Sequence, residues 1–197
     1  TVETPSFKAM LGDSCKRLAE VKTESIDLSV YSPPFADLYT YSSTERDLGN
    51  SRNWDELFAH YQFIVKELLR VTKAGRLTCV HTSDIAAMAM KDGYIGIRDF
   101  PGAVIRAHEQ AGWIFHGRAI VTKNPQAQAI RSHAKALLFV QLRRDSSDSR
   151  PALLDHILIF KKAGQSHVPV NPVKNQEIDN EKHICPLQLG TIERCIK

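Results

Sequence analysis

Long apolar runs and cysteine pairs are missing from this sequence, and each absence narrows what the chain can be. No run approaches the roughly 18 apolar residues that a membrane span needs, and residues 1–7 contain no apolar core of a signal peptide. None of the four cysteines forms a C-x-x-C pair, so we expect no structural zinc site and no bound metal. They are Cys15, Cys79, Cys185 and Cys195. We interpret them as reduced, packed thiols in a cytoplasmic protein.

A strong net charge of either sign is also missing. The chain has 26 Lys and Arg against 22 Asp and Glu, which gives a formal net charge of +4. This mild excess is compatible with a nucleic-acid partner but does not require one. With 43% hydrophobic residues among 197, the chain can form one soluble domain with its own core.

Hydrophobic periodicity predicts strands and helices that alternate along the chain. The clearest helix covers 54–71, with Asn53 as its cap and an end at 74–75. Apolar runs predict strands over 26–31, 77–80, 113–121 and 155–160. Further helices are predicted after Asp13, over 102–110, over a basic stretch at 126–144 and over 186–196, with a long loop at 36–53.

This order of elements predicts an α/β fold. Strands that alternate with helices form a largely parallel sheet with helices on both faces, and ligands bind at the carboxyl ends of its strands. Two polar segments, 32–35 and 81–84, follow predicted strands and should lie at that edge. We assign residues 1–162 to a catalytic part, 163–182 to a linker and 183–197 to a last helical segment.

The segment Ser32-Pro33-Pro34-Phe35 has unusual backbone chemistry. Two consecutive prolines remove two N–H donors and fix two φ angles, and Pro33 keeps Ser32 out of the helical region. The strand must therefore stop pairing, which leaves carbonyl acceptors on a stiff backbone beside Phe35. This suits a planar ring with an amino group: the ring stacks on Phe35, and the amine donates to Ser32 and to the Pro33 carbonyl. The plainer alternative is a rigid turn.

The order of motifs resembles that of the DNA amino-methyltransferases, in the permuted arrangement that places the catalytic motif before the cofactor loop. Gly12-Asp13, a short helix and the strand at 26–31 precede the Ser-Pro-Pro-Phe segment. Later segments resemble further motifs of the family and occur in the same order. They are Ala-Gly-Arg-Leu at 74–77, Ala-Gly-Trp-Ile at 111–114, Lys-Asn-Pro at 123–125 and His-Ile-Cys-Pro-Leu at 183–187. The resemblance implies a Rossmann-like methyltransferase fold.

The resemblance also implies a reaction. A methyl group would pass from S-adenosylmethionine to an exocyclic amine, N4 of cytosine or N6 of adenine, in double-stranded DNA, in an enzyme of restriction-modification, phage or orphan type. The base would be flipped out of the duplex, with Ser32, Pro33, Pro34 and Phe35 as the catalytic residues. Serine at the first motif position is more usual for the cytosine enzymes and aspartate for the adenine enzymes.

One family feature is missing. The cofactor loop, Phe-x-Gly-x-Gly after a strand, should follow His183, but none of the ten glycines forms such a pair after a strand and the sequence ends at Lys197. We therefore expect a fold that is incomplete at its C-terminus and weak or no S-adenosylmethionine binding by the chain alone. The alternatives are an enzyme with a part missing, a non-catalytic DNA-binding or interaction remnant, and one part of a split enzyme completed by another chain or in a homodimer.

Further residues receive roles from the resemblance, each with a plainer alternative. Asp13 would bind the cofactor or cap a helix, and His183 and Pro186 would orient the cofactor or only begin a helix. His81 and Asp84 would line the base pocket or be polar residues satisfied at a strand end. Predicted phosphate contacts, which could instead be a solvated surface, are Arg46, Arg52, Lys123, Arg131, Lys135, Arg143 and Arg144.

Overall fold

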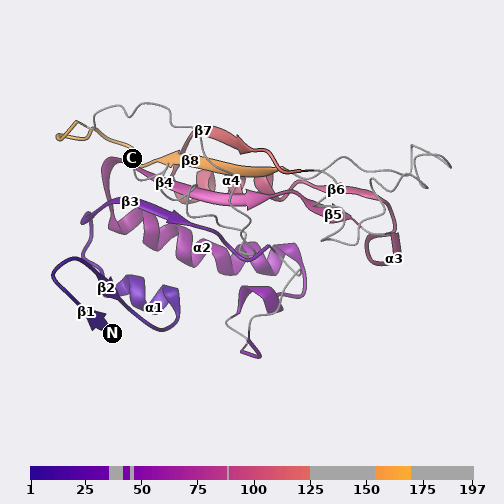
Figure 1. Ribbon diagram of the computed structural model, residues 1–197, viewed down its shortest axis with the longest axis horizontal. Helices are drawn as coiled ribbons and strands as arrows, with labels where there is room; N and C mark the ends of the chain where they lie inside the picture. Colours follow the sequence, from indigo (N-terminus) through magenta and orange to yellow (C-terminus); the bar gives the residue numbers. More distant parts are fainter. Residues whose placement is uncertain (36–41, 45–46, 88, 125–153, 170–197) are drawn as a thin grey trace.

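The computed structural model describes residues 1–35, 42–44, 47–87, 89–124 and 154–169 of the chain. These residues form a four-stranded sheet backed by two long helices (Figure 1). Across the sheet the strands lie in the order β3 (Ile26–Tyr31), β4 (Thr72–Ser83), β8 (Asp155–Lys161) and β7 (Ile114–Val121). The long helices are α2 (Trp54–Val71) and α4 (Phe100–Ala111). The described part confirms the predicted α/β fold.

The strand directions differ from the prediction. β3 and β4 are parallel, whereas β8 runs antiparallel both to β4 and to β7. The prediction of a largely parallel sheet is therefore wrong for the described strands. It assumed a helical crossover between all strands, but β8 lies directly beside β7, the strand before it among the described elements, and pairs with it antiparallel.

Helix α2 forms where the sequence predicts it but passes straight into β4. Asn53 caps its first turn, because the Asn53 side chain accepts from the backbone N–H of Glu56 at 2.9 Å. The helix ends at Val71 and the strand begins at Thr72, so the predicted helix end at 74–75 and strand start at 77 are wrong. Gly75, with a φ of +72°, belongs to an irregularity within β4 and not to a helix cap.

Helix α4 and strand β7 confirm the predictions at 102–110 and 113–121 to within a few residues. Asp99 caps α4, since its side chain accepts from the backbone N–H of Gly102 at 2.7 Å. Gly112, with a φ of +102°, ends the helix in the left-handed conformation. This short turn brings β7 back to the sheet.

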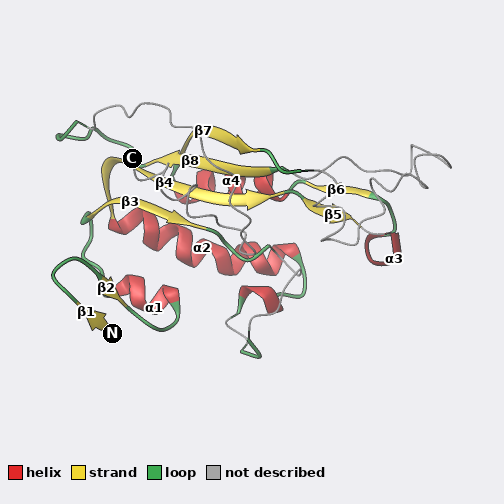
Figure 2. Ribbon diagram, viewed as in Figure 1, coloured by secondary structure: helices red, strands yellow, loops and turns green. Residues whose placement is uncertain are grey.

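Short elements surround the sheet (Figure 2). Only the helix after Asp13 was predicted, because strands of two or three residues carry too little periodicity to recognise. These elements are β1 (Val2–Glu3), β2 (Lys8–Ala9), α1 (Ser14–Ala19), η2 (Leu48–Asn50), β5 (Ile85–Ala87), α3 (Ala89–Asp92) and β6 (Gly96–Arg98). β5 and β6 pair antiparallel as a separate two-stranded sheet, which lies beyond the end of β4 (Figure 1).

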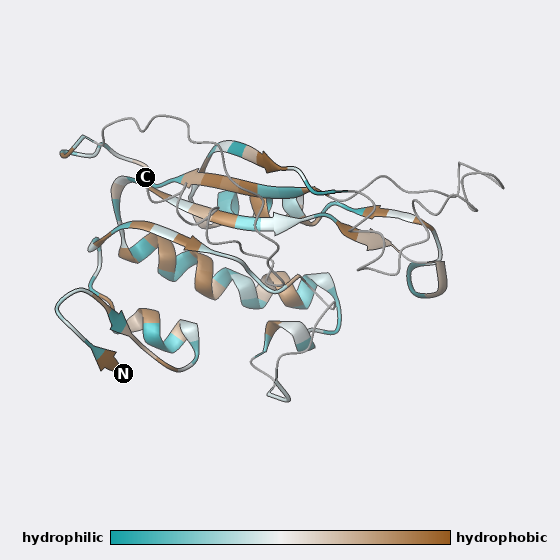
Figure 3. Cartoon of the chain, in the orientation of Figure 1, coloured by the Kyte–Doolittle hydropathy of each residue, from teal (hydrophilic) through white to brown (hydrophobic). Residues whose placement is uncertain are grey.

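The core lies between the sheet and the two long helices. α2 and α4 contact each other and share one apolar cluster with β4 and β8, whose hydrophobic residues appear in brown in Figure 3. Its fully buried members are Val65, Val80, Ile85, Val104, Leu158 and Phe160. No helix in the described ranges is long and apolar enough to cross a membrane. The helices predicted at 126–144 and 186–196 lie outside those ranges, so helices on both faces of the sheet stay a prediction.

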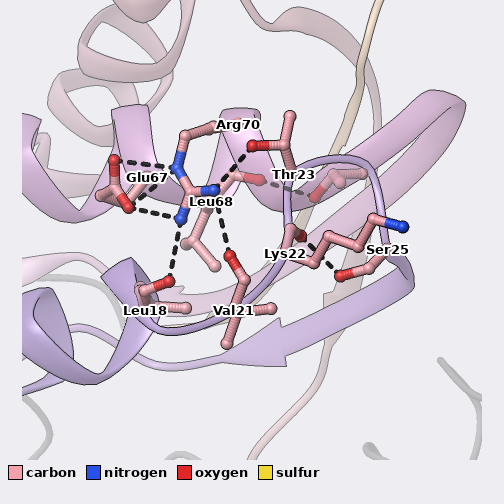
Figure 4. A network of polar contacts seen from close by, with 9 residues as sticks. Leu18, Val21, Lys22, Thr23, Ser25, Glu67, Leu68 and Arg70 are labelled. Carbon is pink, nitrogen blue, oxygen red and sulfur yellow. Dashed lines mark hydrogen bonds and ion pairs between the residues drawn. The ribbon is translucent and has the colours of Figure 1, made fainter.

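Arg70, near the end of α2, holds the connection between α1 and β3 (Figure 4). Its guanidinium donates to the carbonyls of Leu18 and Val21 at 2.9 and 3.0 Å and to the hydroxyl of Thr23 at 2.8 Å. Glu67 accepts from the same guanidinium at 2.8 Å, and this hydrogen bond raises the pKa of Arg70. The contacts fix the entry to β3, the strand that leads to the Ser-Pro-Pro-Phe segment.

Substitution of Gly75 tests how closely β4 packs on the segment after β8. A Cβ at Gly75 would lie 2.5 Å from the backbone nitrogen of Ser166. We expect Gly75→Ala to lower the free energy of unfolding by more than the roughly 1–2 kcal/mol of a left-handed residue alone. Gly93→Ala is the matched control, since Gly93 also has a positive φ, +79°, but nothing within 4 Å. Urea denaturation of both variants measures the difference, and equal losses would rule out a cost from the Ser166 contact.

Candidate active site

Strand ends from across the sheet meet at one edge. The parallel register of β3 and β4 places Ser32 beside His81. β8 runs the opposite way and starts at this edge with Asp155, which is paired with the last residues of β4 and β7. The two polar segments, 32–35 and 81–84, therefore lie together at the carboxyl ends of β3 and β4, as the sequence predicts. The predicted strand end at residue 80 is wrong, however, because residues 81–83 are the last residues of β4.

The Ser-Pro-Pro-Phe segment leaves β3 as an irregular stretch packed against the core. Pro33 is buried, while Phe35 is half-buried and rests on the core cluster. The Phe35 ring centroid lies 6.1 Å from the ring of His81 and 6.1 Å from that of Phe100. Phe35 is thus supported by neighbouring rings but retains exposed surface.

Tyr31, the residue before this segment, is tied to both long helices. Its hydroxyl lies 2.8 Å from the hydroxyl of Tyr61 in α2 and 3.1 Å from Nε2 of His108 in α4. His108 Nδ1 donates to the Val104 carbonyl at 2.8 Å, which leaves Nε2 to accept from Tyr31. Burial raises the pKa of both tyrosines and lowers that of His108 to about 4, although the Val104 hydrogen bond opposes the His108 shift. The network is therefore neutral near pH 7 and fixes the end of β3.

A chain of four polar side chains runs inward from the segment. Ser32 Oγ lies 3.5 Å from His81 Nδ1, and His81 Nε2 lies 3.0 Å from Asp155 Oδ2. The other oxygen of Asp155 forms an ion pair with Lys123 Nζ at 2.5 Å. His81 and Asp155 are 2% and 3% exposed, so their polar atoms depend on each other and not on water.

Asp155 is charged despite its burial. Burial alone raises the pKa of this carboxyl, but the hydrogen bonds from His81 and Lys123 outweigh it and hold the pKa below its usual value. Because a carboxylate is acceptor-only, Nε2 of His81 carries a hydrogen, and in the neutral imidazole Nδ1 then presents a lone pair. In that tautomer the hydroxyl of Ser32 is the donor in the Ser32–His81 contact.

A second acid–histidine pair lies nearby at the same edge. Asp84 Oδ2 and His156 Nε2 are 3.6 Å apart, and His156 is 7% exposed. Thus Asp84 does not join the Ser32 chain, whereas His81 does. His81 is a polar residue that is satisfied at the end of a strand, as one of the two alternatives predicts, and it also contacts the Ser-Pro-Pro-Phe segment.

The remaining predicted site residues are separated. Asp13 caps α1, with its Oδ1 accepting from the backbone N–H of Cys15 at 2.9 Å, so the capping alternative is present. Arg52 is exposed just before α2, and Lys123 pairs with a buried acid. The others lie outside the described residues: Arg46, Arg131, Lys135, Arg143, Arg144, His183 and Pro186.

Sequence reasoning missed Asp155, which it placed only in a strand. A signal was present, because Asp155 and His156 begin an otherwise apolar strand. Its position at the active edge depends on β8 being antiparallel, which periodicity does not reveal. Among the described residues, no group of three His, Cys, Asp or Glu side chains could hold a metal ion.

The sequence matches no protein-family model, and no curated protein matches it significantly. Solved structures do match. TTHA0409 of Thermus thermophilus, assigned as a DNA modification methylase, aligns in its S-adenosyl-L-methionine complex with a TM-score of 0.56 at 17% identity, over 81% of this chain and 55% of that one. PvuII DNA methyltransferase, which is cytosine-N4-specific, aligns with a TM-score of 0.50 at 15% identity, over 78% of this chain and 48% of that one.

This chain has a methyltransferase fold. It spans about half the length of these structural neighbours. The mixed sheet therefore belongs to the methyltransferase architecture, and the edge that holds Ser32 is the edge at which α/β folds bind their ligands.

Proposed function

We propose that the chain provides the target-base part of an S-adenosylmethionine-dependent DNA amino-methyltransferase. The observation that carries the proposal is the Ser-Pro-Pro-Phe segment at the carboxyl end of β3, where the Ser32 hydroxyl and the Phe35 ring lie together beside His81. The proposed target is the exocyclic amine of cytosine or adenine in duplex DNA. The segment suits such a group because it combines a flat apolar face with polar acceptors.

The chain's own residues would hold and orient the base. Its ring would stack on Phe35, which the His81 and Phe100 rings support from behind. The amine would donate to Ser32 Oγ and to the Pro33 carbonyl. These two hydrogen bonds would draw the lone pair of the amine nitrogen away from conjugation with the ring. S-adenosylmethionine would supply the methyl group. Such positioning can lower the barrier by up to roughly 7–11 kcal/mol.

Residues for the cofactor are also proposed. Asp13 would accept from its adenine amine, and His183 and Pro186 would shape the neighbouring wall. The Oδ1 of Asp13 already accepts from the backbone N–H of Cys15, so the cofactor role competes with the helix cap. Replacing Asp13 by Asn should weaken S-adenosylmethionine binding by the full-length protein if this assignment is right.

The direct test is transfer of a labelled methyl group to duplex DNA by the full-length protein. Nucleoside analysis of the product DNA by mass spectrometry distinguishes N4-methylcytosine from N6-methyladenine. Absence of both modified bases, with the cofactor and varied DNA present, would refute the proposal. If the protein methylates no base but binds DNA under the same conditions, the result would support the alternative of a non-catalytic DNA-binding protein.

The basic residues give a separate prediction about DNA binding. We expect Gln replacements of Arg131, Lys135, Arg143 and Arg144 together to weaken binding and to flatten its salt dependence. Each lost phosphate contact should change the slope of log K against log salt by about 0.9. Gln replacements of the exposed Lys16, Lys22 and Lys66 are the control and should leave the slope unchanged. Fluorescence anisotropy at several salt concentrations measures the slopes, and equal slopes for both sets would assign the basic stretch to a solvated surface.

A further inference from the structure

Methylation of an amine releases a proton. The proposed function, on which this inference rests, does not say which group takes up that proton. As the N–CH₃ bond forms and the bond from sulfur to the methyl group breaks, the nitrogen becomes cationic and must lose one N–H proton. The Ser32 hydroxyl is placed to receive that proton. A serine hydroxyl is a weak base, however, so it can do this only by passing its own proton onward.

We propose that His81 takes this proton from Ser32, and that Asp155 and Lys123 position His81 to do so. The amine proton moves to Ser32 Oγ as the Ser32 hydroxyl proton moves to His81 Nδ1. The products are a neutral methylated amine, a neutral serine and an imidazolium that is paired with Asp155. No electron is gained or lost, and the proton passes to solvent after the product leaves.

The tautomer of His81 supports this direction of transfer. Asp155 Oδ2 lies 3.0 Å from Nε2 and can only accept, so Nε2 carries a hydrogen, and in the neutral ring the lone pair at Nδ1 faces Ser32 Oγ. The distance of 3.5 Å between Ser32 Oγ and Nδ1 is long for a hydrogen bond. Catalytic hydrogen bonds are often long in the free protein and shorten when the substrate binds.

The surroundings of His81 favour the charged product. Asp155 is held as a carboxylate in a site that is 3% exposed, where its attraction for an imidazolium is weakly screened. Lys123 pairs with Oδ1, which leaves Oδ2 to His81. The other titratable groups described at this edge, Asp84 and His156, lie toward each other. The Phe35 ring lies beside His81, with 6.1 Å between the ring centroids.

Activity variants test the role of His81 in the full-length protein. We expect His81→Gln to reduce turnover about 10²-fold, the lower end for loss of a general base, with a small change in KM. His156→Gln is the matched control: it removes a buried histidine from the same edge and should keep the wild-type turnover. Thermal melting confirms that the variants remain folded.

A measurement without turnover tests the positioning. Nitrogen-15 chemical shifts of His81 should show the Nε2–H tautomer in the wild-type protein, and Asp155→Asn should weaken that preference. A wild-type Nδ1–H tautomer would overturn the relay whatever the activity, since Nδ1 could then not accept from Ser32.

The outcomes separate the two proposals. If the wild-type protein methylates DNA and His81→Gln matches its rate, the relay is wrong while the proposed function holds. If the wild-type protein methylates no base, the proposed function fails, and the relay, which depends on it, fails too. A slow His81→Gln variant together with the Nε2–H tautomer in the wild-type protein supports both.

Discussion

Replacing Phe35 by alanine should weaken capture of the flipped base and lower methyl transfer while the domain remains folded. Stacking of a base on an aromatic ring contributes about 1–3 kcal/mol, which corresponds to a loss of roughly 5- to 150-fold in kcat/KM. The ring rests on His81 and Phe100 with part of its surface exposed, so its removal leaves the core largely intact. Labelled-methyl incorporation measured over a range of DNA concentrations gives kcat and KM separately.

Companion variants show whether this loss is specific to the base. Ser32→Ala should act mainly on kcat, because its hydrogen bond matters most as the amine becomes pyramidal, and Pro33→Ala should lower kcat by loosening the carbonyl acceptor. Phe63→Ala is the control, since Phe63 is an exposed phenylalanine of α2. If Phe35→Ala melts normally and methylates at the wild-type rate, the segment is only a stiff turn.

Acidification should destabilise the fold through His108. Its pKa is about 4 in the folded protein against 6.5 for an ordinary histidine, chiefly because burial disfavours the charged ring. Between these values the unfolded chain binds a proton that the folded chain excludes, so stability is lost as the pH falls from 6.5 to 4. At about 1.36 kcal/mol per pH unit the loss amounts to about 3 kcal/mol.

Urea denaturation at about pH 7 and at about pH 4.5 measures the effect, since most of the interval between the two pKa values of His108 lies between these pH values. His108→Gln should lower stability at neutral pH, because the ring stacks on Phe160 at a centroid distance of 4.0 Å, but should flatten the pH dependence between the two values. His60→Gln, which removes an exposed histidine of α2, should leave the dependence as in the wild type. A His108→Gln variant with the wild-type slope would assign the acid sensitivity to other groups.

The sequence is sufficient to predict the parts of the fold that depend on periodicity and local stereochemistry. The apolar stripe and Asn53 cap define α2, and the prolines at 33 and 34 define where β3 stops pairing. The position of 32–35 and 81–84 at one edge then follows from the rule for parallel strands. The methyltransferase fold itself was predicted from the order of motifs and agrees with the structural neighbours.

The parts that depend on tertiary pairing were not predictable in this way. Nothing in the apolar run at 155–160 specifies its direction, so neither the antiparallel β8 nor the arrival of Asp155 beside His81 could be foreseen. Gly75 was interpreted as a helix end because a left-handed glycine serves equally in a cap and in an irregular strand. Lys123 was predicted as a phosphate contact, because nothing in the sequence shows that it pairs with Asp155 of β8.

The hydrogen bonds of Tyr31 to the two helices make the position of Ser32 depend on the packing of the core. Neighbouring residues of a strand point to opposite sides, so the hydroxyl that anchors Tyr31 to Tyr61 and His108 also sets the backbone from which Ser32 projects. A substitution that shifts α4 by a fraction of an ångström would misalign Ser32 long before it unfolded the domain. Random mutagenesis scored by activity should therefore recover positions deep in the helix interface, and second changes that restore the packing should restore the activity with it.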